Sequence, residues 1–338
     1  MNKCCAISSK GARIPLFRRR GLTSAISLES LPRSPVADQM AAQVSRTSAN
    51  LLLLVAAAFW GFGNVAQKTV LEHLDPLSAV GLRCLIAGLV VLPLVASERH
   101  PSIRWSYWAS LARVSALFAV SIIIQQIAYQ GTSVTNASFL VNTATVMTPL
   151  AAWLLIGERA TAVIWLAAGA TLIGALLMSG GLSASLSRGD LAALVSAACY
   201  ALWMVELGRH MQVHGNPVAA AAAQFLCAAA MSLPLGFAFG HLSLAAMIDA
   251  GPELAMLGVF STAVAFGIVT ICQRFTSASH AAVIVSAESL FGAAGAAMFL
   301  GERLSTAGAV GATMVLGAIV FLASFGRDSG AQKSMTAA

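Results

Sequence analysis

The sequence predicts an all-α integral membrane protein whose ten transmembrane helices form two inverted five-helix repeats. Composition, the length of the apolar blocks and an internal repeat support this prediction. Hydrophobic residues make up 58% of the 338 residues, charged residues make up 10%, and the mean hydropathy is +0.81. Soluble domains carry about 25% charged residues. This chain therefore has too few charges to cover a globule with polar surface.

The apolar residues arrive in blocks of about 20, the length that a helix needs to cross roughly 30 Å of hydrocarbon. Each block is continuously apolar rather than alternating, which argues against a transmembrane barrel. Short connections leave no room for a soluble catalytic domain between the spans. The expected spans are 51–70, 77–97, 108–128, 134–156, 161–179, 190–210, 217–239, 252–273, 280–300 and 305–325.

The segment before the first span is strongly basic. Residues 1–49 hold eight Lys or Arg and no apolar core long enough for a signal peptide. We expect a disordered cytoplasmic tail, with a targeting or lipid-surface segment as the alternative. Met40 lies shortly before the first span and offers an alternative start. Residues 326–338 are expected to form a C-terminal tail.

The remaining positive charges predict the orientation. With the basic tail inside, the loops and span ends on the cytoplasmic face and the C-terminal tail carry Arg99, Arg104, Arg113, Arg159, Arg209, Arg274, Arg327 and Lys333. The opposite face receives Lys68, Arg188 and Arg303. This bias follows the positive-inside rule. It predicts a multi-pass protein of the cell (inner) membrane with both termini cytoplasmic.

An internal repeat divides the chain. "DPLSAVGLRCLIAGLVVLPL" from Asp75 and "NPVAAAAAQFLCAAAMSLPL" from Asn216 both place Leu-Pro 17 residues after the first proline. Downstream, "FLVNTATVMTPLAAWLLIGERAT" matches "VIVSAESLFGAAGAAMFLGERLS". The expected repeats are residues 50–180 and 188–325. Because five spans is an odd number, the second repeat is inserted upside down, as in secondary transporters, whose substrate site lies near the midplane.

Each repeat contains the tripeptide Gly-Glu-Arg, at 157–159 and at 301–303. The inverted plan places the first tripeptide at the cytoplasm and the second outside, so the two cannot form one site. Glycine ends helices, and glutamate favours the positive end of the next helix dipole. We therefore interpret both tripeptides as helix boundaries.

The doubled block resembles the EamA-type branch of the drug/metabolite transporter superfamily over roughly residues 51–325. Trp60-Gly61, Pro76 with Arg83, Asn136-Ala137 with Pro149, and both Gly-Glu-Arg corners carry the resemblance. It implies export by alternating access through a basket of ten helices. One departure is that Glu288-Ser289 stands where that family often has Glu-Pro.

Glu288 and Arg83 are the main candidates for substrate binding or coupling, because an ionisable residue within hydrocarbon costs about 2.5–3.5 kcal/mol. Glu288 lies roughly 12 Å into its span, where burial favours a protonated carboxyl that can carry a proton. Alternatively, it hydrogen-bonds a neighbouring helix. Arg83 can bind a substrate carboxylate or phosphate, pair with Glu288, or snorkel to the interface. Gln224 is its uncharged counterpart in the second repeat.

Other polar and aromatic residues within the spans are further candidates for the cavity wall. Packing and interfacial anchoring are the alternatives for the aromatic residues, and interhelical hydrogen bonding is the alternative for the amides. These candidates are Trp60, Tyr200, Trp203, Asn64, Gln125 and Asn142.

The leading functional hypothesis is a secondary transporter, in the export direction, of a small metabolite or drug-like solute. A membrane-embedded enzyme is one alternative, but the chain has neither a phosphate-binding loop nor a His-Glu-x-x-His motif. A non-transporting scaffold is the other, although a scaffold needs no inverted repeat. The six cysteines lack metal-ligand spacing, so no cofactor or metal is expected. The expected partners are a small-molecule substrate and the lipid bilayer, not nucleic acid, and homodimerisation is left open.

Overall fold

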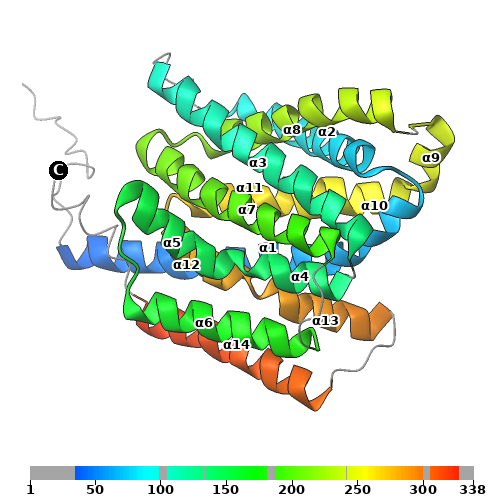
Figure 1. The fold of residues 1–338 in the computed structure, drawn as a ribbon. Coiled ribbons are helices and arrows are strands. Elements are labelled where there is room, and N and C mark those ends of the chain that lie inside the picture. Colours follow the sequence, from blue (N-terminus) through cyan, green and yellow to red (C-terminus); the bar gives the residue numbers. More distant parts are fainter. Residues whose placement is uncertain are drawn as a thin grey trace, which may run out of the picture. The chain divides into compact units, whose positions relative to one another are not determined.

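The computed structural model describes residues 35–98, 105–132, 134–180, 187–240, 242–299 and 305–326, which form helices and short connections with no strand among them. The chain from Ala42 onward forms one compact unit. The helices, labelled in Figure 1, are α1 (Pro35–Thr69), η2 (Val70–Glu72), α2 (Pro76–Val95), α3 (Trp105–Gly131), α4 (Val134–Asn142), α5 (Ala144–Ile156), α6 (Ala162–Met178), α7 (Arg188–Val213), α8 (Pro217–Phe239), α9 (Leu244–Asp249), α10 (Gly251–Ala255), the π-helical η3 (Met256–Val264), α11 (Ala265–Cys272), α12 (Ala278–Val285), α13 (Glu288–Phe299) and α14 (Thr306–Phe325).

Eight helical segments of the described chain are long and apolar enough to cross a membrane. They coincide with the expected spans one to four, six to eight and ten. The expected fifth span is the shorter apolar helix α6, with 17 residues. The expected ninth span is divided between α12 and α13. The prediction of an all-α membrane protein is confirmed, and the count of ten spans stays a prediction.

The first helix starts earlier than expected. α1 begins at Pro35, within the stretch 1–49 that was expected to be a disordered tail. Proline suits the first helical turn, and the Ala and Gln residues that follow favour helix. Residues 1–34 and 327–338, which make up most of the two expected tails, lie outside the described part of the chain.

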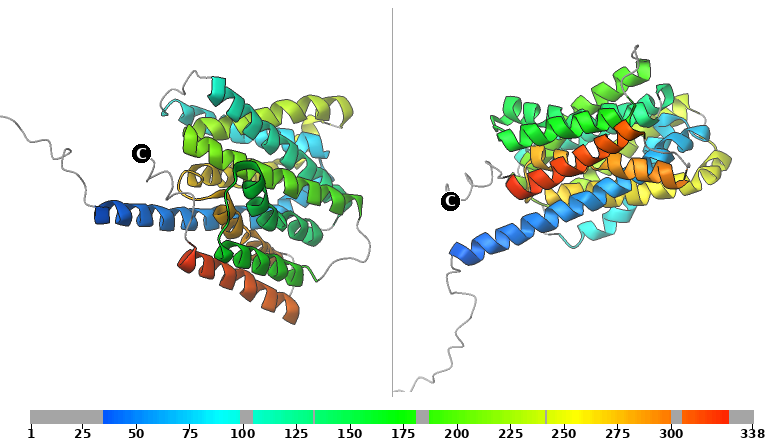
Figure 2. Two further views of the ribbon diagram at one scale, coloured as in Figure 1. Left: turned by 60° about the vertical axis from the view of Figure 1, so that its left-hand side comes forward. Right: turned by 90° about the horizontal axis from the view of Figure 1, so that it is seen from below.

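Equivalent helices of the two repeats pack against each other. α2 packs along α8, and α6 packs along α14, as Figures 1 and 2 show. Glycines permit this approach: a Cβ atom at Gly174 would lie 2.6 Å from the carbonyl oxygen of Gly311, and one at Gly81 would lie 2.6 Å from Leu233. Small residues allow membrane helices to pack closely by dispersion forces. The repeat is therefore present in the packing as well as in the sequence.

Helix boundaries follow the repeated motifs. α2 and α8 begin at Pro76 and Pro217. Gly157 ends α5 in the left-handed conformation, with φ 67°, which confirms the first Gly-Glu-Arg corner as a helix boundary. Thr161 then caps α6 by accepting a hydrogen bond from the backbone N–H of Ile164. The second corner, 301–303, lies outside the described residues, and Ser305 caps α14 as Thr161 caps α6.

The main core is centred on a cluster of aromatic rings from four helices. The Phe118 ring of α3 lies 5.8 Å from Trp203 of α7, 5.7 Å from Phe225 of α8 and 5.0 Å from Phe266 of α11. Trp203 and Phe225 are fully buried. Large aromatic side chains hold these helices together by area and by edge-to-face contacts. A cavity described below lies beside this cluster, and Phe266 contributes to both.

Candidate functional site

Two helices are interrupted at equivalent positions of the repeats. α4 gives way to α5 at Thr143, and α12 gives way to α13 at Ser286 and Ala287. The Gly-Glu-Arg corners are offset by 301 − 157 = 144 residues, and this offset aligns Thr143 with Ala287. In both turns a hydroxyl bonds the carbonyl three residues earlier, Thr143 to that of Leu140 at 2.5 Å and Ser286 to that of Val283 at 2.6 Å. Tight turns inside helices often mark functional hinges, and in transporters paired interruptions mark the substrate site.

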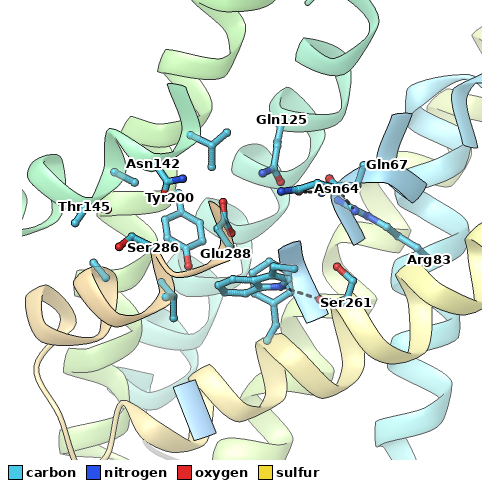
Figure 3. A pocket seen from close by; sticks show the side chains of 16 residues that line it. Asn64, Gln67, Arg83, Gln125, Asn142, Thr145, Tyr200, Ser261, Ser286 and Glu288 are labelled. Carbon is cyan, nitrogen blue, oxygen red and sulfur yellow. Dashed lines mark hydrogen bonds between the residues drawn. The ribbon is translucent and has the colours of Figure 1, made fainter. Parts of the chain in front are cut away.

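A cavity lies where these interruptions meet α1, α2, α3, α7 and the π-helical segment η3. It is lined by Trp60, Asn64, Gln67, Arg83, Gln125, Val141, Asn142, Ala144, Thr145, Tyr200, Ser261, Phe266, Ala282, Val285, Ser286 and Glu288. Figure 3 shows these side chains converging from both repeats. The space that the centres of water molecules can reach is about 40 Å³, enough for a few waters. A metabolite therefore needs the surrounding helices or side chains to move.

Glu288 is the acid among the lining residues. It is the first residue of α13, and its carboxyl group points into the cavity in Figure 3. Within the described residues it forms no side-chain hydrogen bond and no ion pair. The phenol groups of Tyr129 and Tyr200 lie close enough to interact electrostatically with the Glu288 carboxyl group. The hydrogen bond to a neighbouring helix, which was the structural alternative for Glu288, is therefore not seen here.

The turn before Glu288 explains how the chain tolerates its departure from Glu-Pro. The backbone N–H of Ser289 donates to the carbonyl oxygen of Ser286 at 3.2 Å, and its hydroxyl donates to the same oxygen at 2.9 Å. Proline has no N–H to donate. Ser289 therefore closes the turn by hydrogen bonding where proline would do so by its fixed φ.

Arg83 is the residue with a positively charged side chain among the lining residues, and it is 2% exposed. Its Nη1 donates to Oε1 of Gln67 at 3.3 Å, while Nε and Nη2 are buried without a hydrogen-bond partner. Among the described residues it has no ion-pair partner, so it does not pair with Glu288. Its burial within the protein also argues against snorkelling. The third alternative, binding of an anionic group, stays a prediction.

An amide network joins Arg83 to the centre of the cavity. Gln67 donates to Oδ1 of Asn64 at 3.0 Å, and the Tyr129 hydroxyl donates to the same oxygen at 3.1 Å. Asn64 in turn donates to the Ser138 hydroxyl at 3.3 Å. Helices α1, α2, α3 and α4 are therefore linked through one buried chain of polar groups, which gives Arg83 a defined orientation.

The aromatic side chains of the cavity come from the first helix of each repeat and from α11. Trp60 donates its indole N–H to the carbonyl oxygen of Ser261 in η3 at 2.9 Å, and its ring lies 4.6 Å from Phe266 and 6.2 Å from Tyr200. The Tyr200 hydroxyl is buried with no hydrogen-bond partner in the described chain. Gln125 and the remaining sequence candidate Asn142 also line the cavity.

Trp203 and Gln224 are the two sequence candidates that do not line the cavity. The Trp203 indole N–H donates to Oε1 of Gln224 at 2.5 Å, and both side chains are buried in the core. The indole N–H of Trp203 and the amide oxygen of Gln224 therefore have each other as hydrogen-bond partners between α7 and α8. In the first repeat Arg83, at the position matching Gln224, bonds Gln67 of α1.

Sequence reasoning missed four polar lining residues, Gln67, Thr145, Ser261 and Ser286. Gln67 follows Asn64 by three positions, which places both on one helix face, so its spacing was an available signal. The hydroxyl residues gave no such signal. Serine and threonine occur throughout membrane helices, and only the packing shows which of them face the cavity.

The structure places other polar groups outside this cavity. Glu206 pairs with Arg209, three residues further along α7, at 3.8 Å and with Arg113 of α3 at 3.4 Å. His210 lies 3.0 Å from the Ser110 hydroxyl. The described cysteines, Cys84, Cys199, Cys227 and Cys272, are free thiols. No group of three metal-binding side chains is found in the described part of the chain.

Comparison with known proteins identifies the family. The sequence profile of the EamA-like transporter family matches residues 47–180 and again residues 187–324. The chain belongs to the EamA-like transporter family. Both matches coincide with the two repeats, so each repeat of this EamA-like protein is one family unit. The family falls within the drug/metabolite transporter superfamily.

Individual relatives agree with this membership. An "Uncharacterized transporter" of Archaeoglobus fulgidus is 25% identical over 252 residues, covering 73% of this chain and 77% of the relative. A crystal structure of another protein superposes with a TM-score of 0.68 at 18% identity, covering 82% of this chain and 96% of the other. The latter shows the fold alone. This EamA-like chain is a multi-pass membrane transporter of the drug/metabolite type.

Proposed function

We propose that this EamA-like protein is a proton-coupled secondary transporter that exports a small metabolite or drug-like solute by alternating access. The observation that carries the proposal is the meeting of two interrupted helices, from equivalent positions of both repeats, at a cavity that holds Glu288. In an inverted repeat, movement of one half against the other opens such a cavity to one face at a time. The proposed setting is the cell (inner) membrane, with both termini cytoplasmic.

Proton coupling is assigned to Glu288 on the basis of its surroundings. The charged and titratable groups near it are Tyr129 of α3, Tyr200 of α7 and, through the amide network, Arg83 of α2. Opening the cavity to water on either side changes the solvation of the carboxyl, and with it the balance between its charged and protonated forms. Proton binding and cavity opening are then linked reciprocally.

Transport in proteoliposomes tests the coupling. The solute is first identified by comparing metabolites in the medium of cells with and without the overexpressed chain. Glu288→Gln keeps the shape and hydrogen bonding of a protonated carboxyl but cannot release a proton. We expect this variant to exchange solute for solute while losing accumulation driven by a pH gradient.

Glu206→Gln serves as the matched control, because Glu206 pairs with Arg113 and Arg209 outside the cavity. It should accumulate solute as the parent protein does. If Glu288→Gln also accumulates solute under the pH gradient, Glu288 does not carry the proton. If the parent protein neither exchanges solute nor accumulates it under the pH gradient, the proposed transport mechanism is wrong.

A further inference from the structure

A groove lies on the surface of the protein at the corner that joins α5 to α6. It is lined by Pro149, Trp153, Arg159, Ala160 and Trp165, and none of these residues lines the cavity that holds Glu288. The space that the centres of water-sized molecules can reach is about 290 Å³ in the groove and about 40 Å³ in the central cavity. The groove is therefore accessible to a ligand without any movement of the helices.

The side chains of the groove offer hydrogen-bond donors and apolar surface but no acceptor. Trp153 and Trp165 are 50% and 40% exposed, and their indole N–H groups have no hydrogen-bond partner within the described residues. Arg159 is exposed and forms no ion pair in the described part of the chain. Pro149 and Ala160 add apolar surface. The groove therefore fits a ligand that joins oxygen acceptors to hydrocarbon, as a phospholipid does at its phosphate and ester groups.

The charge of the lining favours an anionic headgroup. Arg159 is the charged residue among the five, and the neighbouring Glu158 is not part of the lining. A guanidinium group holds two oxygens of a phosphate through parallel N–H groups. The ammonium group of a zwitterionic headgroup would meet no acid in the groove, whereas a headgroup with one negative charge is balanced by Arg159 alone.

The position of the groove suits such a lipid. Figure 1 shows the corner between α5 and α6 at the same end of the helices as the end of α14, which is the face that the arginine bias assigns to the cytoplasm. Tryptophan side chains favour the membrane interface. Basic pockets between transmembrane helices on the cytoplasmic side are typical binding sites for anionic headgroups.

The corner of the second repeat does not carry the same residues. At the offset of 144 residues, alanine stands where the first corner has its proline and both tryptophans, at positions 293, 297 and 309. Interfacial anchoring alone calls for aromatic residues at both faces of the membrane. The one-sided set therefore favours a specific ligand at the first corner.

We propose that this groove binds one anionic phospholipid of the cytoplasmic leaflet. The phosphate pairs with Arg159, and the start of an acyl chain lies along Trp153 and Trp165 toward Pro149. The four residues from Pro149 to Trp153 span roughly 6 Å of helix, so the groove holds the first carbons of the chain and the bilayer holds the rest. Since α5 also carries Thr145 of the central cavity, the bound lipid contacts an element of the transport site.

Native mass spectrometry of the full-length chain in detergent tests the site. The protein is mixed with equal amounts of phosphatidylglycerol and phosphatidylethanolamine that carry the same acyl chains. We expect one phosphatidylglycerol per chain to stay bound at concentrations at which phosphatidylethanolamine does not. Arg159→Gln should weaken this binding about tenfold, because it removes a hydrogen bond between charged groups. Trp153→Leu should weaken it severalfold, because it removes a donor and apolar area.

Two residues outside the groove provide matched controls. Arg274 is an exposed arginine beside an aromatic ring, with its guanidinium carbon 5.9 Å from the centre of the Phe275 ring. Trp108 is 50% exposed, as Trp153 is. Arg274→Gln and Trp108→Leu should bind phosphatidylglycerol as the parent does. The unfolding temperature of each variant without lipid, which should match that of the parent, shows that the variant is folded.

Each outcome decides the question. Equal retention of the two lipids overturns the anionic class, and undiminished binding in Arg159→Gln overturns the phosphate contact. Equal weakening by Arg159→Gln and Arg274→Gln would reveal a general attraction of the basic face for lipid and would overturn the groove as a site. Undiminished binding in Trp153→Leu overturns the place of the acyl chain. None of these results bears on solute transport, so the lipid site and the proposed function can fail separately.

Discussion

At the residue scale, Gly61 is the contact point between the two repeats at the site. A Cβ atom there would lie 2.5 Å from the carbonyl oxygen of Glu288, 2.6 Å from Cβ of Phe291 and 2.7 Å from the backbone nitrogen of Gly292. α1 can therefore lie against the first turn of α13 only because residue 61 lacks a side chain. The adjacent Trp60 then reaches the carbonyl of Ser261. In the Trp-Gly pair, Trp60 lines the cavity and Gly61 allows α1 to approach α13 closely.

Gly61→Ala should therefore destabilise the protein by about 1–3 kcal/mol, the usual cost of overpacking a tight contact. It should also impair transport, since the added methyl group pushes α1 away from Glu288. Gly267→Ala is the matched control, because nothing lies within 4 Å of a Cβ atom at that helical position, and its stability should be unchanged or raised. Thermal unfolding in detergent measures both. Equal unfolding temperatures for the Gly61→Ala variant and the parent would refute the close approach.

At the scale of the element, α8 depends on a cap from the other repeat. Asn216 adopts a left-handed conformation, φ 55°, and its side chain does not cap the helix. Instead, Glu98, in the segment after α2, accepts hydrogen bonds from the backbone N–H groups of Val218 and Ala219, each at 2.9 Å. A carboxylate at a helix N-terminus satisfies free donors and opposes the helix dipole. α2, in contrast, is capped by its own Asp75.

Glu98→Ala should lower the free energy of unfolding by about 1–2 kcal/mol, because it removes both cap bonds. Glu98→Gln should cost less, since its amide oxygen still accepts one bond. Asp249→Ala removes an exposed acid at the C-terminal end of α9 and serves as the control. Unfolding in detergent at several denaturant concentrations gives the comparison. A Glu98→Ala variant as stable as the control would show that α8 does not rely on this cap.

At the scale of the whole molecule, helix ends that the inverted plan assigns to one face contact each other. Lys68, near the end of α1, donates to the carbonyl oxygen of Tyr129 at 2.6 Å, near the end of α3. Thr132, after α3, donates to Oδ1 of Asp190 in the first turn of α7 at 2.5 Å. On the other face, Glu98 meets the start of α8. These contacts support the alternating arrangement of the spans, and the arginine bias supports their orientation.

Labelling of single cysteines from outside the cell tests that orientation. In a background without the native cysteines, a membrane-impermeant thiol reagent should modify position 302 and leave position 158 unmodified. The first position belongs to the corner expected outside and the second to the corner expected in the cytoplasm. The opposite pattern would reverse the orientation, and modification of both positions would contradict the inverted repeat.

Several features of this protein could be predicted from the sequence because their causes are local. Hydropathy over about 20 residues sets where a span lies, and the starts of α2 and α8 at Pro76 and Pro217 follow from proline in the first turn. Gly157 ends α5 because glycine adopts positive φ without strain. Buried charge is costly wherever it occurs, which made Glu288 and Arg83 candidates before any contact was known.

Tertiary structure alone decided which polar residues share the cavity. Trp60 and Trp203 lie in the first spans of their repeats, yet Trp60 lines the cavity while Trp203 is paired with Gln224 in the core. Arg83 and Gln224 occupy matching positions and still make different bonds. The face that a membrane helix turns inward depends on its neighbours, because hydrocarbon surrounds all its apolar faces alike. The turns at Thr143 and Ser286 were likewise not predicted from the sequence and became evident only in the structure.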